Sequence, residues 1–349
     1  MAIVADPAPP RTRILSGIQP SGRLHLGNYF GAIRQHLELQ ATSDCFYFIA
    51  NYHALTTVKE PAALRRNTLD VAATYLALGL DPDRTVFFRQ SDVPEVCELT
   101  WLLMTVTGMG LLERAHSYKD KIARGIKPSV GLFAYPVLMA SDILAYRPRL
   151  VPVGKDQEQH VEMAQDMAAS FHHAFGTEVF VRPEPRFTET ARVPGTDWER
   201  GPDGSFLRDE RGRRVPQKMS KSYGNTLEIF AEGRALKRAV GRIPTDSVAL
   251  ENPIDPDDCL VFQLCALFLE PDEQAELRAR YRAGGFGYGR AKEVLLAQFD
   301  RVFGPYRERK QALDRDPDTL EDILRAGGAR ARAVARATLN DARRACGID

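Results

Sequence analysis

The sequence predicts an α/β protein, with a doubly wound parallel sheet first and an all-helical region after it. Up to about Phe171, short apolar runs of strand character alternate with longer helical segments. Such alternation with short links is typical of a Rossmann-like parallel sheet that helices cover on both faces. From Asp257 onward nearly every segment favours helix and is interrupted at prolines and glycines, which predicts an all-helical second domain.

Four strands are expected, over residues 14–18, 45–50, 85–88 and 149–153. The second of these is a continuous apolar run, as in a strand that is covered on both faces. The helices expected around them span residues 27–40, 61–78, 95–121, 135–146 and 156–171.

The chain is expected to have three parts. Residues 1–13 form a flexible tail, residues 14–225 a sheet domain and residues 226–349 a helical domain. The tail lacks a basic start followed by an apolar run, so it does not resemble a secretory signal. Residues 194–217 are polar and contain glycine and proline, which predicts an exposed hairpin or loop with a turn at residues 210–213.

Charge and cysteine content narrow the possible functions. The 47 basic residues nearly balance the 46 acidic ones, with a net charge of +1. This balance suits a small-molecule enzyme, or a nucleic-acid partner that meets a local positive surface. Five cysteines occur without a CxxC pair, which argues against zinc-ribbon and thioredoxin sites and indicates a reduced, cytoplasmic compartment. No apolar run reaches the roughly eighteen residues of a membrane helix.

A glycine-rich stretch, residues 19–31, leads from the first strand into a helix. Gly22 and Gly27 have no Cβ, so the backbone there can approach a ligand closely. A helix that begins near Gly27 presents free N–H groups, which suit an anion. His25 is placed to donate to a phosphate, and Asn28 to bond a sugar or base. The alternative is a strand–helix turn with an incidental histidine.

Residues 218–222, Lys-Met-Ser-Lys-Ser, follow the polar loop. Lys218 and Lys221 are flexible point charges, which suit a mobile clamp on a polyphosphate. The alternative is a solvated loop.

On the helix expected over 135–146, Tyr135, Met139 and Asp142 share one face. A carboxylate among apolar neighbours needs a partner. An indole suits it, because its N–H donates and does not accept; a tyrosine hydroxyl would also serve. The alternative is an aspartate that faces water.

Residues 151–156, Val-Pro-Val-Gly-Lys-Asp, form a strand that ends at a glycine before the next helix. In an open parallel sheet, the loops at the carboxyl ends of the strands form the ligand crevice. Asp156 is also expected to cap the helix that follows.

Motifs in residues 17–29, 135–144, 151–160 and 218–222 together resemble those of the class I aminoacyl-tRNA synthetases, most closely the bacterial tryptophanyl-tRNA synthetases. The segment His-Leu-Gly-Asn at residues 25–28 stands for that family's His-Ile-Gly-His signature. The resemblance runs from about Ile14 to near the C-terminus. It is weakest in the tail and in the loop before Lys218, which looks longer than usual for the family.

The resemblance implies an enzyme that activates tryptophan with ATP to tryptophanyl-adenylate and pyrophosphate. Tryptophan then passes to the 2′-hydroxyl of the 3′-terminal adenosine of tRNA(Trp). The catalytic residues implied are His25, Lys218, Lys221 and Gln19. ATP binding is implied for Gln19, Pro20, Ser21, Gly27, Asn28, Gly154, Lys155, Asp156, Val193, Lys218, Met219, Ser220, Lys221 and Ser222. Tryptophan binding is implied for Asp142, Met139, Tyr135, Val151, Val153 and Gln157.

No metal ligands are implied in the protein itself, and Mg²⁺ is expected to bind through the ATP phosphates. The resemblance also implies that the helical domain meets the tRNA anticodon, and that the enzyme is a cytoplasmic homodimer with no membrane contact. Arginines near the C-terminus are candidate RNA contacts: Arg325, Arg330, Arg332, Arg336, Arg343 and Arg344. The apolar segment 99–112, with Trp101, Met104 and Met109, is a candidate for the dimer interface, although a core helix would explain it equally.

Three alternative functions stay open at this point. A tyrosine-activating relative of the same fold would differ in what Asp142 binds. A nucleotidylyltransferase also uses a His-x-Gly-His-like turn, but it would not explain the helical domain or an amino-acid pocket. A non-catalytic RNA- or protein-binding regulator would not need His25, Lys218 and Lys221.

Overall fold

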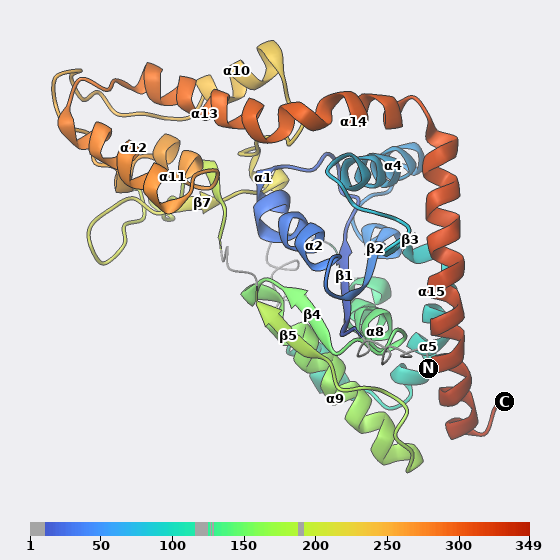
Figure 1. Ribbon diagram of the computed structural model, residues 1–349. Coiled ribbons are helices and arrows are strands. Elements are labelled where there is room, and N and C mark those ends of the chain that lie inside the picture. Colours follow the sequence, from blue (N-terminus) through green and yellow to red (C-terminus); the bar gives the residue numbers. More distant parts are fainter. Residues whose placement is uncertain (1–10, 116–124, 126, 128, 188–191) are drawn as a thin grey trace, which may run out of the picture. The chain divides into compact units, whose positions relative to one another are not determined.

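The computed structural model describes residues 11–115, 125, 127, 129–187 and 192–349. The chain divides into two compact units (Figure 1). The sheet unit comprises Met1–Gly22, Gln35–Thr188 and Leu313–Asp349, and the helical unit comprises Arg23–Arg34 and Glu189–Ala312. This division differs from the expected boundary at residue 225. The segment with the Lys-Met-Ser-Lys-Ser motif belongs to the helical unit, and the end of the chain belongs to the sheet unit.

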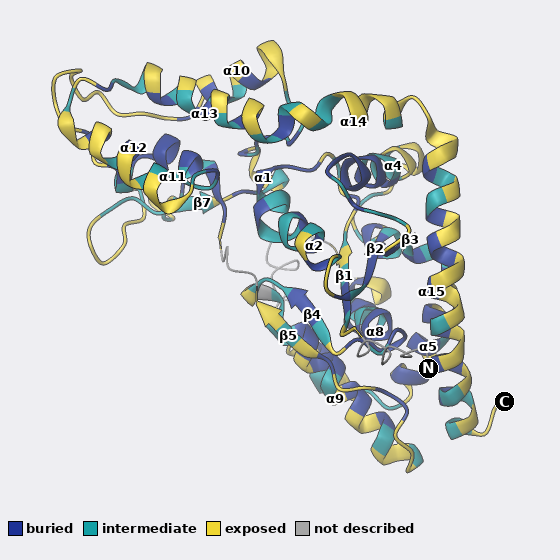
Figure 2. Ribbon diagram, in the orientation of Figure 1, coloured by how far each residue is buried: buried dark blue, intermediate teal, exposed yellow. Residues whose placement is uncertain are grey.

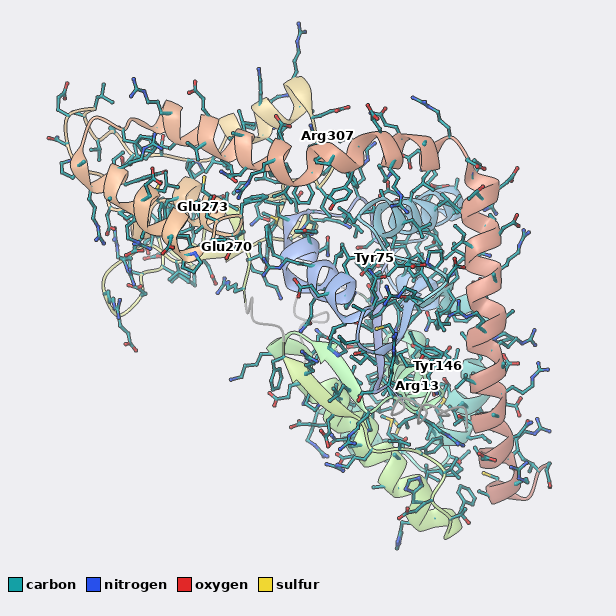
Figure 3. All side chains as sticks on the ribbon, in the orientation of Figure 1. Arg13, Tyr75, Tyr146, Glu270, Glu273 and Arg307 are labelled. Carbon is teal, nitrogen blue, oxygen red and sulfur yellow. The ribbon has the colours of Figure 1, made fainter. Side chains whose placement is uncertain are left out.

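The sheet unit contains five parallel strands in the order β3-β2-β1-β4-β5. Their bounds are β1 (Arg13–Ile18), β2 (Asp44–Ile49), β3 (Val86–Arg89), β4 (Leu150–Val153) and β5 (Glu184–Phe187). The four expected strands are confirmed within a residue or so. The fifth, β5, was missed because the sequence Glu-Pro-Arg-Phe has no apolar pattern, and this edge strand is largely exposed. Arg13 starts β1 and donates to Tyr146 O at 3.0 Å (Figure 3). The sheet therefore begins inside the expected tail 1–13, of which residues 1–10 lie outside the described residues.

Helices connect the strands of the sheet unit. Their bounds are α2 (Arg34–Leu39), α3 (Asn51–Ala54), α4 (Pro61–Ala77), η2 (Gln90–Asp92), α5 (Glu95–Met104), α6 (Met109–Glu113), α8 (Val130–Leu144), η3 (Lys155–Gln157), α9 (Glu158–Phe175) and α15 (Pro317–Cys346). The first residue of α2, Arg34, is assigned to the helical unit. Part of the helix expected over 95–121 lies outside the described residues. Most residues of α8 are buried (Figure 2), and Ser129 caps its first turn.

The C-terminal helix α15 packs against the edge strand β3 of the sheet unit. A Cβ at Gly327 would lie 1.8 Å from Phe87 O, and one at Gly328 would lie 2.8 Å from Asp92 Cβ. Only glycine permits this approach, and the helix covers an edge that would otherwise offer unpaired backbone groups. The last helix of the expected helical domain 226–349 therefore belongs to the sheet unit.

Arginines of α15 pair with carboxylates of α5. Arg332 and Arg336 each donate to Glu95 Oε1 at 2.7 Å, and Arg343 donates to Glu98 Oε1 at 2.6 Å. Glu95 is buried, so these bonds neutralise a charge that would be costly there. These arginines thus have a structural role, which their clustering in the sequence did not reveal.

The helical unit holds the remaining elements. They are α1 (Leu26–Asn28), a π-helical turn η1 (Tyr29–Ile33), β6 (Pro194–Trp198), β7 (Pro216–Lys218), η4 (Lys221–Tyr223), α10 (Gly233–Gly241), η5 (Pro256–Asp258), α11 (Leu260–Ala266), α12 (Pro271–Ala283), α13 (Tyr288–Phe303), η6 (Gly304–Tyr306) and α14 (Arg307–Asp314), which ends in the sheet unit. At the start of α12, Glu270 N donates to Glu273 Oε2 at 2.9 Å (Figure 3). Proline and the acidic first turn explain why this helix begins there.

The segment between β6 and β7 is a pair of tight turns, and the turn expected at residues 210–213 is confirmed. The backbone forms isolated antiparallel β-bridges between Arg200 and Phe206 and between Arg208 and Arg214. Gly212 has a φ of 76°, a conformation that glycine adopts without strain. Among the described residues, no helix is both long and apolar enough to cross a membrane.

Candidate active site

Asp142 is buried in α8 and hydrogen-bonded on both oxygens. Gln90 Nε2 lies 2.9 Å from Oδ1 and 2.7 Å from Oδ2, and His53 Nε2 lies 2.7 Å from Oδ2. Burial raises the pKa of Asp142, and the bonds from His53 and Gln90 act against that shift. The alternative of a solvent-facing aspartate is therefore excluded: the side chain belongs to a polar cluster inside the apolar core.

Gln90 and His53 are functional candidates that the sequence analysis missed. Each follows a strand closely: Gln90 directly follows β3, and His53 lies in α3, just after β2. Because the carboxyl ends of parallel strands meet at one edge of a sheet, their positions could have revealed them. Gln90 Oε1 also accepts from Tyr52 N at 3.0 Å. The amide therefore joins the start of α3 to the carboxylate of α8, and its orientation is fixed by both contacts.

A cavity of about 350 Å³ opens beside this cluster. Its lining residues are Tyr52, His53, Leu55, Thr56, Lys59, Cys97, Thr100, Met104, Ser129, Gly131, Ala134, Tyr135 and Leu138. His53 thus borders the cavity and bonds Asp142. Tyr135 Oη lies 3.1 Å from His160 Nε2, and burial raises the pKa of Tyr135 to about 12. The cavity is largely apolar, with a few polar groups at fixed positions, as in small-molecule sites.

The remaining residues implied for tryptophan lie near the same core. Val151 is buried in it, and Met139 and Val153 pack against it. Gln157 is the N-cap of α9, and residues 155–157 first form the 3₁₀ turn η3. The Asp156 side chain, expected to cap this helix, lies outside the described part of the structure. The sheet unit therefore brings Tyr135 and Asp142 together around the polar cluster, and Val151 and Val153 into the neighbouring strand.

The sequence segments implied for ATP in the sheet unit follow neighbouring strands. Residues 19–21 follow β1, and residues 154–156 follow β4. The strand order reverses between β1 and β4, and such a switch point is where open α/β sheets form their ligand crevice. Ser21 N donates to Gln19 O at 2.9 Å, so the first segment makes a tight turn. Pro20 is buried, while Gln19, Ser21 and Lys155 are exposed.

In the helical unit, His25 precedes the short helix α1 and its backbone is tied to Asn28. His25 N donates to Asn28 Oδ1 at 3.1 Å, and Asn28 N donates to His25 O at 2.8 Å. Leu26 N donates to Leu227 O at 2.9 Å, and Gly27 N to Met219 Sδ at 3.3 Å. The expectation that this helix start presents free N–H groups is therefore wrong.

Gly27 has a different role, because its missing Cβ leaves room for the imidazole. A Cβ there would lie 2.9 Å from His25 Cε1 and 3.4 Å from Met219 Cβ. Burial, and secondly the charge of Lys221, lower the pKa of His25 to about 4, so the imidazole is neutral at pH 7. Its Nδ1 is buried without a hydrogen-bond partner in the described part of the chain.

Asn225 closes the Lys-Met-Ser-Lys-Ser loop, residues 218–222. Its Oδ1 accepts from Ser220 N at 2.8 Å, and its Nδ2 donates to Lys218 O at 3.1 Å. Met219 is buried, and its N donates to Val193 O at 3.0 Å. Ser222 Oγ lies 2.9 Å from Ser220 Oγ. The two sequence motifs meet in this unit, since Met219 contacts Gly27 and Lys221 influences His25.

Comparison with known proteins identifies this arrangement. The family described as tRNA synthetases class I (W and Y) matches residues 9–304. The tryptophan–tRNA ligase of Rhodopirellula baltica is 52% identical over 337 residues, which are 96% of this chain and 99% of that protein. The chain belongs to the class I tryptophanyl-tRNA synthetases. It is therefore an aminoacyl-tRNA ligase, as the sequence motifs implied.

Solved structures agree with this assignment to the tryptophanyl-tRNA synthetases. The enzyme of Campylobacter jejuni, complexed with ADP and tryptophan, superposes with a TM-score of 0.85 at 47% identity, covering 96% of this chain and all of that one. A tyrosyl-tRNA synthetase of Archaeoglobus fulgidus, complexed with tyrosine, gives a TM-score of 0.62 at 18% identity. The second likeness shows the shared fold alone.

Proposed function

We propose that this synthetase joins L-tryptophan to ATP, forming tryptophanyl-adenylate and pyrophosphate, and then transfers tryptophan to the terminal adenosine of tRNA(Trp). The observation that carries the proposal is the buried carboxylate of Asp142, held by His53 and Gln90 beside a cavity that His53 also lines. The related C. jejuni enzyme in its complex with ADP and tryptophan supports the choice of substrates.

Asp142 is proposed to accept the indole N–H of tryptophan. An ionised carboxylate has about four lone-pair sites, and the bonds from Gln90 and His53 do not use all of them. These two donors favour the charged, accepting form against the effect of burial. Met139, Tyr135, Val151, Val153 and Gln157 are proposed to surround the rest of the amino acid. A phenylalanine side chain could offer no donor to this group.

Adenylate formation needs no general base, because the tryptophan carboxylate is already ionised at pH 7. The protein's task is to hold that carboxylate in line with the α-phosphorus and to stabilise charge on the phosphates. The neutral imidazole of His25 is proposed to donate an N–H to a phosphate oxygen. Lys218 and Lys221 follow the departing pyrophosphate as mobile cations.

The other nucleotide contacts are proposed from the motif segments. They are Gln19, Pro20, Ser21, Gly27, Asn28, Gly154, Lys155, Asp156, Val193, Met219, Ser220 and Ser222. Mg²⁺ is proposed to arrive bound to the ATP phosphates, whose negative charge it offsets. The described residues contain no group of three or more His, Cys, Asp or Glu side chains placed to hold a metal ion.

The enzyme is proposed to act as a cytoplasmic homodimer that also binds the tRNA anticodon through residues 226–349. In the segment 99–112, Leu99, Leu103 and Leu112 are buried, whereas Trp101 and Met109 are 66% and 62% exposed. The exposed side borders an apolar groove of about 550 Å³ lined in part by Met104, Met109 and Val130. A second copy of the chain, as the resemblance implies, would cover these side chains.

The experiment that tests the function is amino-acid-dependent exchange of pyrophosphate into ATP, measured with each amino acid in turn. Tryptophan is expected to support the fastest exchange. Fastest exchange with tyrosine would point to the tyrosine-activating relative. Exchange that needs no amino acid would point to a nucleotidylyltransferase, and no exchange at all would favour a non-catalytic protein.

A further inference from the structure

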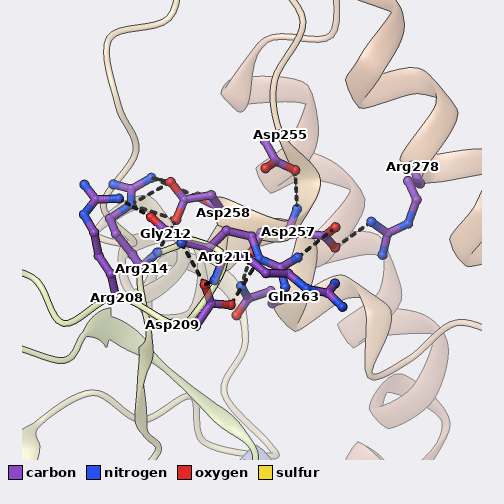
Figure 4. Close-up of polar contacts among 11 residues, drawn as sticks. Arg208, Asp209, Arg211, Gly212, Arg214, Asp255, Asp257, Asp258, Gln263 and Arg278 are labelled. Atoms are coloured by element: carbon purple, nitrogen blue, oxygen red, sulfur yellow. Dashed lines mark hydrogen bonds and ion pairs between the residues drawn. The ribbon is translucent and has the colours of Figure 1, made fainter.

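Arg214, just before β7, is held by Asp258 through both its main chain and its side chain (Figure 4). Arg214 N donates to Asp258 Oδ1 at 2.8 Å, and Arg214 Nε lies 3.1 Å from each carboxylate oxygen. Arg214 Nη2 also donates to Asp258 O at 2.8 Å. An arginine fork that meets a carboxylate at several points fixes direction as well as distance.

The guanidinium of Arg214 also lies over the ring of Trp198, with its Cζ 4.5 Å from the ring centroid. Trp198 is buried at the end of β6 and pairs with Pro216 of β7. Cation–π contact of this kind restricts the plane of the guanidinium. Arg214 is thus held by β6 through a ring and by Asp258 through hydrogen bonds.

Asp258 provides a firm anchor because it ends η5 just before the buried helix α11. The neighbouring Asp257 bonds Arg278 of α12 at 2.5 Å and Arg213 at 3.1 Å (Figure 4). Arg278 Cζ in turn lies 4.8 Å from the ring centroid of Phe262 in α11. Two consecutive arginines of the segment 194–217 therefore bind two consecutive aspartates of the helical framework.

Lys218 is only four residues beyond Arg214, in an extended segment. The β6–β7 ladder is short and irregular, pairing Pro194 with Lys218 and Trp198 with Pro216. A strand of three residues fixes its register weakly by itself. The position of Lys218, and of Lys221 beyond it, therefore depends in part on what holds Arg214, beside the contacts that Asn225 and Met219 make in the same loop.

We infer that the Arg214–Asp258 pair is a positioning device for the Lys218–Lys221 clamp, coupling it to the helical framework of its unit. The inference rests on the proposed function, in which this clamp stabilises the departing pyrophosphate. Arg214 touches no substrate and acts through β7. Loss of the pair would let β7 move, and misplacement of a charge-stabilising group by about 1 Å can cost about 10²-fold in rate.

The test compares the rate of the first turnover of adenylate formation in the full-length enzyme with its tryptophan KM. Arg214→Ala and Asp258→Ala are each expected to lower the rate by about tenfold to about 10²-fold, while the tryptophan KM changes by less than about twofold. The double variant is expected to be no slower than the worse single variant, because both remove the same pair.

Arg200→Ala is the matched control. Arg200 lies in the same segment, but its guanidinium contacts Gly204 O at 2.8 Å and the ring of Phe206 at 4.1 Å. The Arg200→Ala substitution removes the same charge as Arg214→Ala but leaves the contacts of Asp258 in place. The first-turnover rate of this variant is expected to match that of the unchanged enzyme. A rate for Arg214→Ala equal to that of Arg200→Ala would overturn the inference, as would equal losses in rate and in tryptophan affinity.

Should Arg214→Ala fail to fold, Arg214→Lys takes its place, because it keeps the charge and the stem but loses the fork. It is expected to be slowed as well, and a normal rate would overturn the inference. Failure of the proposed function would be seen separately, as the absence of tryptophan-dependent exchange in the unchanged enzyme. Failure of this inference alone would leave that exchange intact and insensitive to Arg214.

Discussion

The side-chain amide of Gln90 spans both oxygens of the Asp142 carboxylate, at 2.9 and 2.7 Å. Since Gln90 Oε1 is occupied by the main chain of α3, the amide cannot turn its acceptor toward Asp142. The contact therefore orients the carboxylate and favours its ionised form, which a donor such as an indole N–H requires.

Asp142→Ala is expected to impair tryptophan use far more than ATP use. The tryptophan KM in pyrophosphate exchange should rise by about tenfold to about 10²-fold, because the substrate N–H loses its acceptor, whereas the ATP KM should stay nearly constant. Ser141→Ala, which alters a neighbour bonded to Val137 O, is the control. Equal changes in both KM values would show that Asp142 has only a structural role.

Gln90→Leu is expected to weaken the enzyme in two measurable ways. Removing its bonds to a buried carboxylate should lower the free energy of unfolding by about 1–3 kcal/mol and should raise the pKa of Asp142 further. Tryptophan affinity should then fall more steeply as the pH is lowered than it does in the unchanged enzyme. Affinity that keeps its normal pH dependence would contradict the proposed role of Gln90.

Lys221→Ala is expected to slow the first turnover of adenylate formation by about 10²-fold, because a cation at the developing pyrophosphate charge is lost. Tryptophan binding and the unfolding temperature should be unchanged. The pKa of His25, which the charge of Lys221 lowers, should rise somewhat in a proton NMR titration. Lys237→Ala, on the exposed side of α10, is the control. An unaltered first turnover would refute the clamp.

We expect His36 to make a contribution to the free energy of unfolding that is lost at acid pH. It is buried, stacks on Tyr47 and bonds Tyr75 Oη at 3.0 Å, and burial lowers its pKa to about 3. The unfolded chain therefore binds a proton below about pH 6.5 that the folded one does not, so stability is full above that pH and is lost as the pH falls. His36→Gln should remove about 2 kcal/mol of the difference in unfolding free energy between pH 7 and pH 5, measured in urea. An unchanged pH dependence would argue against this role.

Gly327→Ala is expected to disrupt the docking of α15. Its Cβ would lie 1.8 Å from Phe87 O, an impossible contact that backbone on both sides resists. The unfolding temperature should fall by several degrees, since overpacking typically costs about 1–3 kcal/mol. Gly289→Ala in α13, where a Cβ would meet nothing within 4 Å, should be neutral or slightly stabilising. Similar effects of both changes would contradict the close approach.

The sequence was sufficient for the parallel sheet because its buried strands are nearly continuous apolar runs. It was not sufficient for β5, whose edge position leaves no apolar pattern, or for α15, whose place depends on Gly327 and on pairs such as Arg332–Glu95 that are distant in sequence. The sequence of a helix-forming segment predicts a helix, but it does not predict which unit the helix packs against.

Some residues of the candidate site could also be predicted from the sequence, and others could not. His25, Lys221 and Asp142 stand in recognisable motifs, whereas Gln90, His53 and Asn225 lie outside them, and only the places of Gln90 and His53 just after strands could have revealed those two. The expectation of free N–H groups at the start of α1 was wrong because Leu227 and Met219, about two hundred residues away, supply the acceptors. Partners so distant along the chain become visible only in the folded structure.

The most direct measurement compares tryptophan with an isostere in which sulfur replaces the indole N–H, in pyrophosphate exchange by the unchanged enzyme and by Asp142→Ala. The unchanged enzyme should prefer tryptophan in kcat/KM by about tenfold to about 10²-fold, and the variant should show no preference. Equal use of both compounds by the unchanged enzyme, or an undiminished preference in the variant, would contradict the assignment of Asp142 as the acceptor of the indole N–H.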